Sequence, residues 1–107
     1  MTESEIQRAV FDHLRARAFP DVVFWHCPND LSSRRKPGFL AGVSDVNAVH
    51  KGKFYALELK KDGGRPSVEQ LKFVSRINAT FAYAAVAEGL PQALGMLEAW
   101  NLIREEA

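Results

Sequence analysis

The residues of this chain that could do chemistry lie in two short apolar segments. Asp45 lies in the segment 44–50, and Glu58 and Lys60 lie in the segment 53–60. Each segment is rich in valine, aromatic residues or leucine, which predicts a β-strand. The linker between them contains a glycine, which can take the positive φ that a tight hairpin turn requires. The pattern therefore predicts a β-hairpin that carries two acids and a lysine.

The register of this hairpin decides whether the two acids meet. If the turn has two residues, His50 pairs with Lys53 and Asp45 lies opposite Glu58; a four-residue turn keeps this register and a three-residue turn breaks it. Opposed residues have Cβ atoms roughly 4.5–5.5 Å apart, and two carboxylates at that distance repel unless a cation lies between them. Lys60 projects from the same face as Glu58 because strand side chains alternate. This cluster predicts a divalent-metal site beside a fixed cation.

The order Asp…Glu-X-Lys across a hairpin resembles the PD-(D/E)XK nuclease superfamily, and the surrounding residues narrow the resemblance to its VRR-NUC family. That family includes small phage and bacterial nucleases and the nuclease module of the Fanconi-anaemia-associated nucleases. The matching residues are 3–7, 28–29, 34–36, 42–45, 58–60 and 63–70. Two features depart from the family pattern. Ser44 replaces the usual proline before the aspartate, and residues 77–80 lack the glycine usual between the last helix and its strand.

The resemblance implies a fold and an activity. The fold is α/β, with a restriction-endonuclease-like αβββαβ core in which helices flank a mixed sheet. The activity is that of a Mg²⁺- or Mn²⁺-dependent DNA endonuclease, selective for branched DNA such as Holliday junctions, acting as a homodimer. Two alternatives stay open: a catalytically inactive nuclease fold that binds nucleic acid or a partner, and a structural subunit whose hairpin charges form ion pairs.

The resemblance also implies roles for the hairpin residues. Asp45 and Glu58 would hold the metal ion through oxygen ligands, and the main-chain carbonyl of Leu59 would be a further ligand. A bound metal ion lowers the pKa of a water and neutralises charge on the phosphate. Lys60 would orient the attacking water or stabilise the developing negative charge. None of these roles needs a histidine or a covalent nucleophile.

Two helical residues are also candidates for the site. Glu3 and Glu5 compete for the helical carboxylate that the resemblance places near the metal ion, and a capping box with Thr2 explains Glu5 without function. We favour Glu3, although a solvated first-turn acid that suits the helix dipole explains this residue nearly as well. The resemblance also brings Gln70 to the active site. Gln70 fits a capping box with Ser67 as well, and one side chain could not easily do both.

Basic and amide residues around the predicted site form the expected nucleic-acid interface. A run of charge is usually a solvated face, but lysine and arginine beside a metal site favour phosphate contacts. No segment resembles a base-reading helix, so the sequence predicts recognition of DNA shape. The predicted nucleic-acid-binding residues are Asn29, Arg34, Arg35, Lys36, Lys61 and Arg65.

The elements that must position these residues follow from periodicity and turn signals. Thr2 begins a helix that Pro20 should end. A polar loop with two prolines and two glycines precedes the hairpin. The remaining expected elements are a strand at 22–25, a loop at 28–42, a helix at 67–78, a strand at 80–86 and a helix at 90–103.

Composition bounds the class of protein but not its function. The chain has 107 residues, 47% of them hydrophobic, which fits one globular domain spanning residues 1–107. No apolar run approaches the roughly 20 residues that span a bilayer. The single cysteine fits a reducing cytoplasm, and we expect a cytoplasmic protein of bacterial or phage origin. The net charge of +1 means that any attraction to phosphate depends on local clusters.

Overall fold

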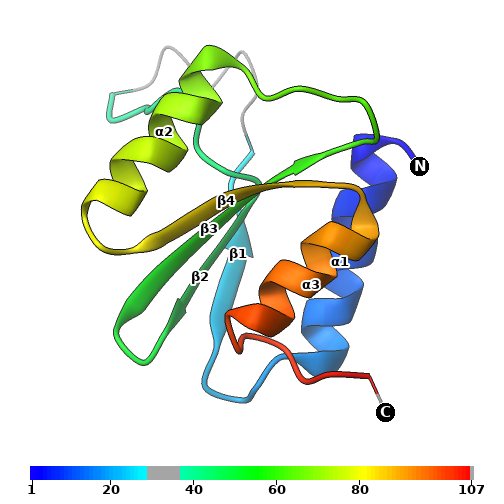
Figure 1. Cartoon of the computed structure of the whole chain (residues 1–107). Helices are drawn as coiled ribbons and strands as arrows, with labels where there is room; N and C mark the ends of the chain where they lie inside the picture. Colours follow the sequence, from blue (N-terminus) through cyan, green and yellow to red (C-terminus); the bar gives the residue numbers. More distant parts are fainter. Residues whose placement is uncertain (29–36, 107) are drawn as a thin grey trace.

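The computed structural model describes residues 1–28 and 37–106, and its centre is a four-stranded mixed sheet between helices (Figure 1). Strands β1, β2 and β3 are antiparallel, whereas β4 runs parallel to β3. Figure 1 shows α2 on one face of the sheet and α1 and α3 on the other. The predicted α/β fold is confirmed. In chain order the elements are α1 (Glu3–Arg17), β1 (Val23–His26), β2 (Val46–His50), β3 (Lys53–Lys60), α2 (Val68–Ala79), β4 (Tyr83–Glu88) and α3 (Leu90–Ala99).

The hairpin has the predicted register. His50 pairs with Lys53, and the ladder continues to Val46 opposite Leu57. Both turn residues have positive φ, 51° at Lys51 and 77° at Gly52, as the favoured two-residue hairpin turn requires. The first strand of the hairpin begins at residue 46 rather than 44, so Asp45 lies just beyond the ladder.

The core has two parts because β3 alternates its side chains. Leu57 and Leu59 pack into the larger apolar cluster, which contains residues of α1 and α3. Ala56 packs into a smaller cluster with Phe73 of α2. Since Glu58 alternates with the leucines, it faces the α2 side of the sheet.

Both predicted capping boxes are present. The Thr2 and Ser67 side chains each accept from the backbone N–H three residues on, and the side chains of Glu5 and Gln70 return the bond. α1 is 15 residues long. In the described ranges, no helix has the length and apolar character needed to cross a membrane.

The strand expected at 80–86 begins later, at Tyr83. Thr80 caps α2, and Phe81 takes a φ of 66° and is 94% exposed. Phe81 thus occupies the left-handed conformation, which a glycine would take without strain. The Asn78 side chain then bonds the backbone N–H and C=O of Ala84 at 2.8 and 3.0 Å. These contacts set the start of β4.

The ends of three other elements also differ from the sequence prediction. β1 spans Val23–His26, one residue later than expected, and α1 ends at Arg17 before Pro20. α3 ends at Ala99 because Asn101 has a φ of 59°. Leu102 and Ile103 beyond it are buried, and Ile103 bridges to Ala18 after α1. Of the loop expected at 28–42, residues 29–36 lie outside the described residues.

Candidate active site

The open end of the hairpin brings Asp45 and Glu58 together. The ladder ends at Val46 and Leu57, and the same register places Asp45 opposite Glu58. The Asp45 Oδ2 atom accepts a hydrogen bond from the Leu59 main-chain N–H at 2.9 Å. This bond fixes the Asp45 carboxylate against β3, beside the carboxylate of Glu58.

Glu58 is a buried acid without enough partners. It is only 2% exposed, and its Oε1 atom is buried with no hydrogen-bond partner. Burial, repulsion by Asp45 and a hydrogen bond with Asp45 together raise the pKa of Glu58 to about 9. Of the described side chains, only Glu58 and Ser44 have a buried polar atom without a partner, and both lie at this end of the hairpin. The site therefore has unused capacity to bind a cation.

Lys60 lies between two glutamates. Its Nζ atom is 3.8 Å from Glu58 Oε2 and 3.7 Å from Glu3 Oε1, and its side chain is only 12% exposed. One lysine thus faces two acids, with a third acid at Asp45. The cluster remains net negative, which favours a further positive charge.

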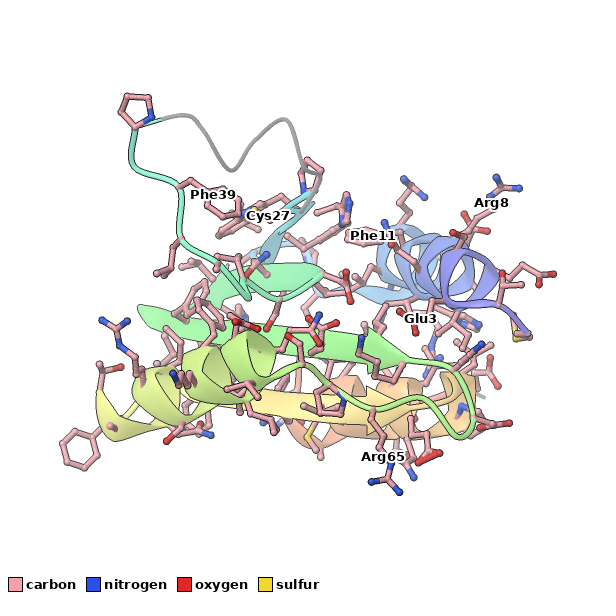
Figure 2. The ribbon with its side chains drawn as sticks, turned by 90° about the horizontal axis from the view of Figure 1, so that it is seen from above. Glu3, Arg8, Phe11, Cys27, Phe39 and Arg65 are labelled. Carbon is pink, nitrogen blue, oxygen red and sulfur yellow. The ribbon has the colours of Figure 1, made fainter. Side chains whose placement is uncertain are left out.

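The structure distinguishes the two helical acids. Glu5 caps its own helix, because its Oε1 atom accepts from the Thr2 N–H at 2.9 Å. The backbone and side-chain hydrogen bonds of Thr2 hold the pKa of Glu5 below its usual range. Glu3 instead lies between the start of α1 and the sheet and contacts Lys60 (Figure 2). Glu3 is therefore the helical acid that reaches the candidate site.

Gln70 caps α2 and also reaches the candidate site. Its Oε1 atom accepts from the Ser67 N–H at 2.8 Å, and its Nε2 atom donates to Glu58 Oε2 at 3.1 Å. The expectation that one side chain could not easily do both is wrong, because an amide has an acceptor at one end and donors at the other. The start of α2 is thereby tied to the buried acid.

The predicted nucleic-acid-binding residues are only partly described. Asn29, Arg34, Arg35 and Lys36 lie outside the described residues. Lys61 and Arg65 are exposed in the segment after β3, and Arg65 points away from the ribbon (Figure 2). The nucleic-acid roles of all six residues stay predictions.

Sequence patterns assigned no role to His26, which the structure places behind Asp45. The His26 Nδ1 atom is 2.9 Å from the Asp45 main-chain carbonyl. Since a carbonyl only accepts, Nδ1 carries the proton in this contact, and the Gln7 Nε2 atom lies 3.1 Å from both ring nitrogens. Gln7 lies one helical turn after Glu3, so a single face of α1 contacts the site twice. A contact between separate elements leaves no pattern in a single sequence.

The donor set fits a hard divalent cation held by few protein ligands. In residues 1–28 and 37–106, no three His, Cys, Asp or Glu side chains form a group that could hold a metal ion, and Glu3 contacts Lys60 rather than joining Asp45 and Glu58. The two hairpin carboxylates nevertheless supply hard oxygen donors, one of them without a partner. Mg²⁺ is commonly bound by one or two carboxylates with several waters.

Two solved structures of known proteins share the fold of this chain. No protein-family model and no curated protein matches the chain. A solved structure described as a VRR_NUC domain protein is similar, with a TM-score of 0.76, 21% identity and coverage of 92% of this chain and 86% of that chain. Another, described as a VRR_NUC domain, has a TM-score of 0.69 and 19% identity, and the match covers 94% of this chain and 99% of that one. The chain therefore has the fold of the VRR_NUC domain proteins, as its sequence predicted.

Proposed function

We propose that this protein is a Mg²⁺- or Mn²⁺-dependent endonuclease that hydrolyses phosphodiester bonds in DNA. The observation that carries the proposal is the pair formed by Asp45 and Glu58, in which a buried carboxylate oxygen has no partner. Burying one acid beside another is costly unless a cation offsets the charge. The likeness to VRR_NUC domain structures supports the nuclease class.

The acids and their neighbours have separate tasks in this proposal. Asp45, Glu58 and the main-chain carbonyl of Leu59 would hold the metal ion, which when bound lowers the pKa of a water and neutralises charge on the phosphate. The Leu59 N–H orients Asp45, and Gln70 orients Glu58. Fixed ligands hold the site in one geometry before the substrate arrives.

Lys60 would act on the phosphate or on the attacking water. Its ammonium group lies within 4 Å of Glu3 and Glu58, and these contacts keep it aimed at the site. A fixed cation stabilises negative charge as it develops on the phosphate oxygens. Glu3 would serve as the helical acid of the site, and its contact with Lys60 adds a positioning task to its predicted role as a metal ligand.

The finer parts of the proposal rest on the family resemblance. We propose branched or structured DNA, such as a Holliday junction, as the substrate. We also propose a homodimer, because two copies can engage two strands of one junction. A small domain that reads DNA shape gains its second strand contact in this way.

The test is cleavage of labelled single-stranded, duplex, flap, fork and four-way-junction DNA with Mg²⁺, Mn²⁺ or EDTA. Wild-type protein should cut in metal and not in EDTA, and Lys60→Ala should abolish cutting. Lys53→Ala is the matched control, since Lys53 lies at the far end of the same strand. Metal-independent cutting, or equal cutting by Lys60→Ala, would contradict the proposal. A folded protein that binds no metal and cuts no DNA would favour the inactive fold.

A further inference from the structure

A groove beside the candidate site runs between α1 and β1, the edge strand of the sheet. Its volume is about 470 Å³. The floor is aromatic: Phe11 of α1 lies between the helix and β1 (Figure 2), and its ring meets the His26 ring edge-on at 6.0 Å. Phe24 lies at 6.2 Å from Phe11 on the same floor. Of these three rings Phe11 is buried, Phe24 is half-buried and His26 is exposed, so the groove offers a partly aromatic surface.

The wall of the groove is positively charged. Arg8 and Arg15 line it from α1, and the lining drawn from the described residues contains no acid. The two arginines lie roughly 10 Å apart along the helix, at 1.5 Å rise per residue. Arg15 pairs with Asp12 at 3.2 Å, but both side chains are about two-thirds exposed, and such pairs are weak. Both guanidinium groups can therefore turn to an anionic ligand.

The groove leads to the candidate site. Gln7 and His26 line the end of the groove near the start of α1, and the His26 ring is bonded to the Asp45 main-chain carbonyl at 2.9 Å. Glu3, on the same helix, contacts Lys60. A polymer that presents a phosphate to Asp45 and Lys60 can therefore continue along α1 past Arg8 to Arg15.

We propose that this groove binds single-stranded nucleic acid, an inference that rests on the proposed nuclease function of the adjacent site. Arginines beside aromatic rings bind the backbone and stack on unpaired bases, whereas duplex bases hide their flat faces. β1 is also an edge strand of the sheet among the described residues, and an edge of this kind can add a peptide strand. Charge decides between the two, since two exposed arginines and no acid among the described lining residues favour a polyanion.

The test is binding of fluorescently labelled oligothymidine and of duplex DNA, measured by anisotropy in EDTA over a range of salt concentrations. The double variant Arg8→Glu/Arg15→Glu should bind oligothymidine at least about tenfold more weakly, and the salt slope should fall by about 0.7 for each lost phosphate contact. The matched control is Lys72→Glu/Arg76→Glu, which makes the same charge change on α2, on the other face of the sheet. The control should bind within about twofold of wild type.

Two results would overturn the inference. Unchanged binding by the α1 double variant would do so, and would leave the edge of β1 to a peptide. Equal losses in both double variants would also do so, because the effect would then follow net charge alone. Cleavage separates this inference from the proposed function. If wild-type protein cleaves DNA in a Lys60-dependent way while the α1 double variant binds oligothymidine normally, only the inference about the groove is wrong. If wild-type protein never cleaves DNA but the α1 double variant loses binding, the inference about the groove is supported.

Discussion

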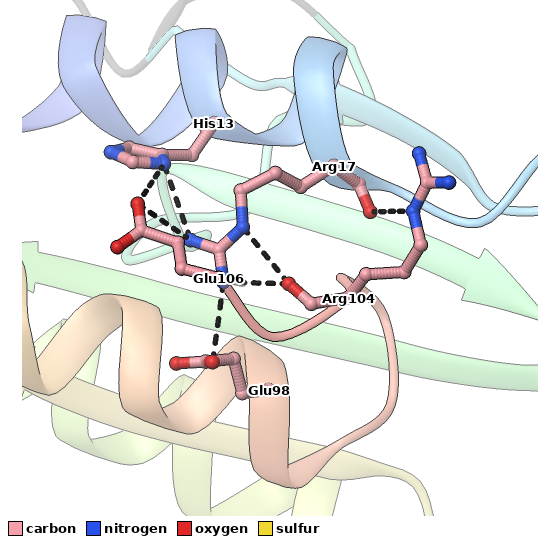
Figure 3. A network of polar contacts seen from close by, with 5 residues as sticks. All are labelled: His13, Arg17, Glu98, Arg104 and Glu106. Atoms are coloured by element: carbon pink, nitrogen blue, oxygen red, sulfur yellow. Dashed lines mark hydrogen bonds and ion pairs between the residues drawn. The ribbon is translucent and has the colours of Figure 1, made fainter.

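The two ends of α1 carry charged clusters of opposite character. At its C-terminal end, Arg17 donates to the Arg104 main-chain carbonyl at 2.6 and 2.9 Å and to Glu98 at 3.2 Å (Figure 3). Glu106 lies 3.8 Å from the same guanidinium group. At its N-terminal end, Glu3 joins Lys60 and Glu58, where acids outnumber the lysine. Both clusters connect α1 to distant parts of the chain.

The difference between the clusters lies in whether their polar atoms have partners. Around Arg17 each guanidinium nitrogen has a partner. A structural role, holding α1 to α3 and to the C-terminal segment, therefore accounts for this network. Around Glu58 a buried oxygen has none, and burial together with the neighbouring Asp45 raises the pKa of Glu58. Stability alone does not favour such a group. A buried, unsatisfied and like-charged cluster therefore indicates chemistry more clearly than a larger, balanced one.

The largest effect on cleavage should come from removing one acid of the cluster around Glu58. Asp45→Asn should lower metal-dependent cleavage by on the order of 10²–10³-fold, as the loss of a preorganised charged group typically does. The same change should weaken the pH dependence of stability in the metal-free protein, because the Asp45 carboxylate no longer opposes ionisation of Glu58. Cleavage rates and urea unfolding in EDTA would measure both. Asp21→Asn, which removes an acid paired with His50 at the other end of the hairpin, should leave cleavage unchanged; a loss in both variants would contradict the comparison.

The next effect concerns pH. The pKa of Glu58 is about 9 in the folded protein against an ordinary 4.5, so the folded state holds a proton that the unfolded state releases. The stability that this proton gives is fully present below pH 4.5 and is lost as pH rises toward about 9. In EDTA the free energy of unfolding should fall by up to about 1.4 kcal/mol per pH unit in this window. Urea unfolding of wild type, Glu58→Gln and Glu69→Gln would measure this.

Glu58→Gln should flatten the pH profile in that window, because the amide does not titrate. Glu69→Gln removes an exposed acid on α2 and should follow wild type. A Glu58→Gln profile as steep as that of wild type would assign the dependence to another group and weaken the contrast between the clusters.

Substitutions in the cluster around Arg17 should lower the stability of the protein and leave its cleavage activity unchanged. Arg17→Ala removes several charge-assisted hydrogen bonds from a side chain that is 13% exposed, and should lower the free energy of unfolding by about 2 kcal/mol. Arg15→Ala removes only an exposed pair and should cost less than about 0.5 kcal/mol. Thermal unfolding would measure both. A change in cleavage rate of a folded Arg17→Ala protein would show that the two clusters are coupled.

The smallest effect should come from Ser44, whose buried Oγ atom has no partner. Ser44→Ala should leave stability unchanged or raise it by about 0.5 kcal/mol, because an unsatisfied hydroxyl is lost. Ser67→Ala removes a hydroxyl that caps α2 and should cost about 1 kcal/mol. Urea unfolding of both variants would measure the contrast. Equal losses would mean that the Ser44 hydroxyl has a partner in solution.

Local rules made the hairpin and both helix starts predictable from the sequence. A two-residue turn and the alternation of side chains fixed the register that places Asp45 opposite Glu58. Capping boxes located the first turns of α1 and α2. The start of β4 was not predictable, because Phe81 takes a conformation that its side chain disfavours and the Asn78 side chain holds Ala84 at the start of the strand.

Contacts between elements could not be predicted in the same way. Gln70 reaches Glu58 because the loop before β2 packs closely on the start of α2. At Gly42, where φ is 82°, a Cβ atom would lie 2.3 Å from the Glu69 carbonyl oxygen. The link between His26 and Asp45 depends likewise on β1 lying beside β2. Such distances follow from packing and leave no periodic signal in the chain.

The most direct test of the central claim is calorimetric titration of Mn²⁺ into the metal-free protein at pH 7, in two buffers with different ionisation heats. We predict one bound ion with release of a proton, because Glu58 must lose its proton to bind a metal ion. Binding should be lost in Asp45→Asn and unchanged in Asp21→Asn. Absence of binding to the folded wild-type protein, or equal binding by Asp45→Asn, would contradict the claim that the two hairpin acids form a metal site.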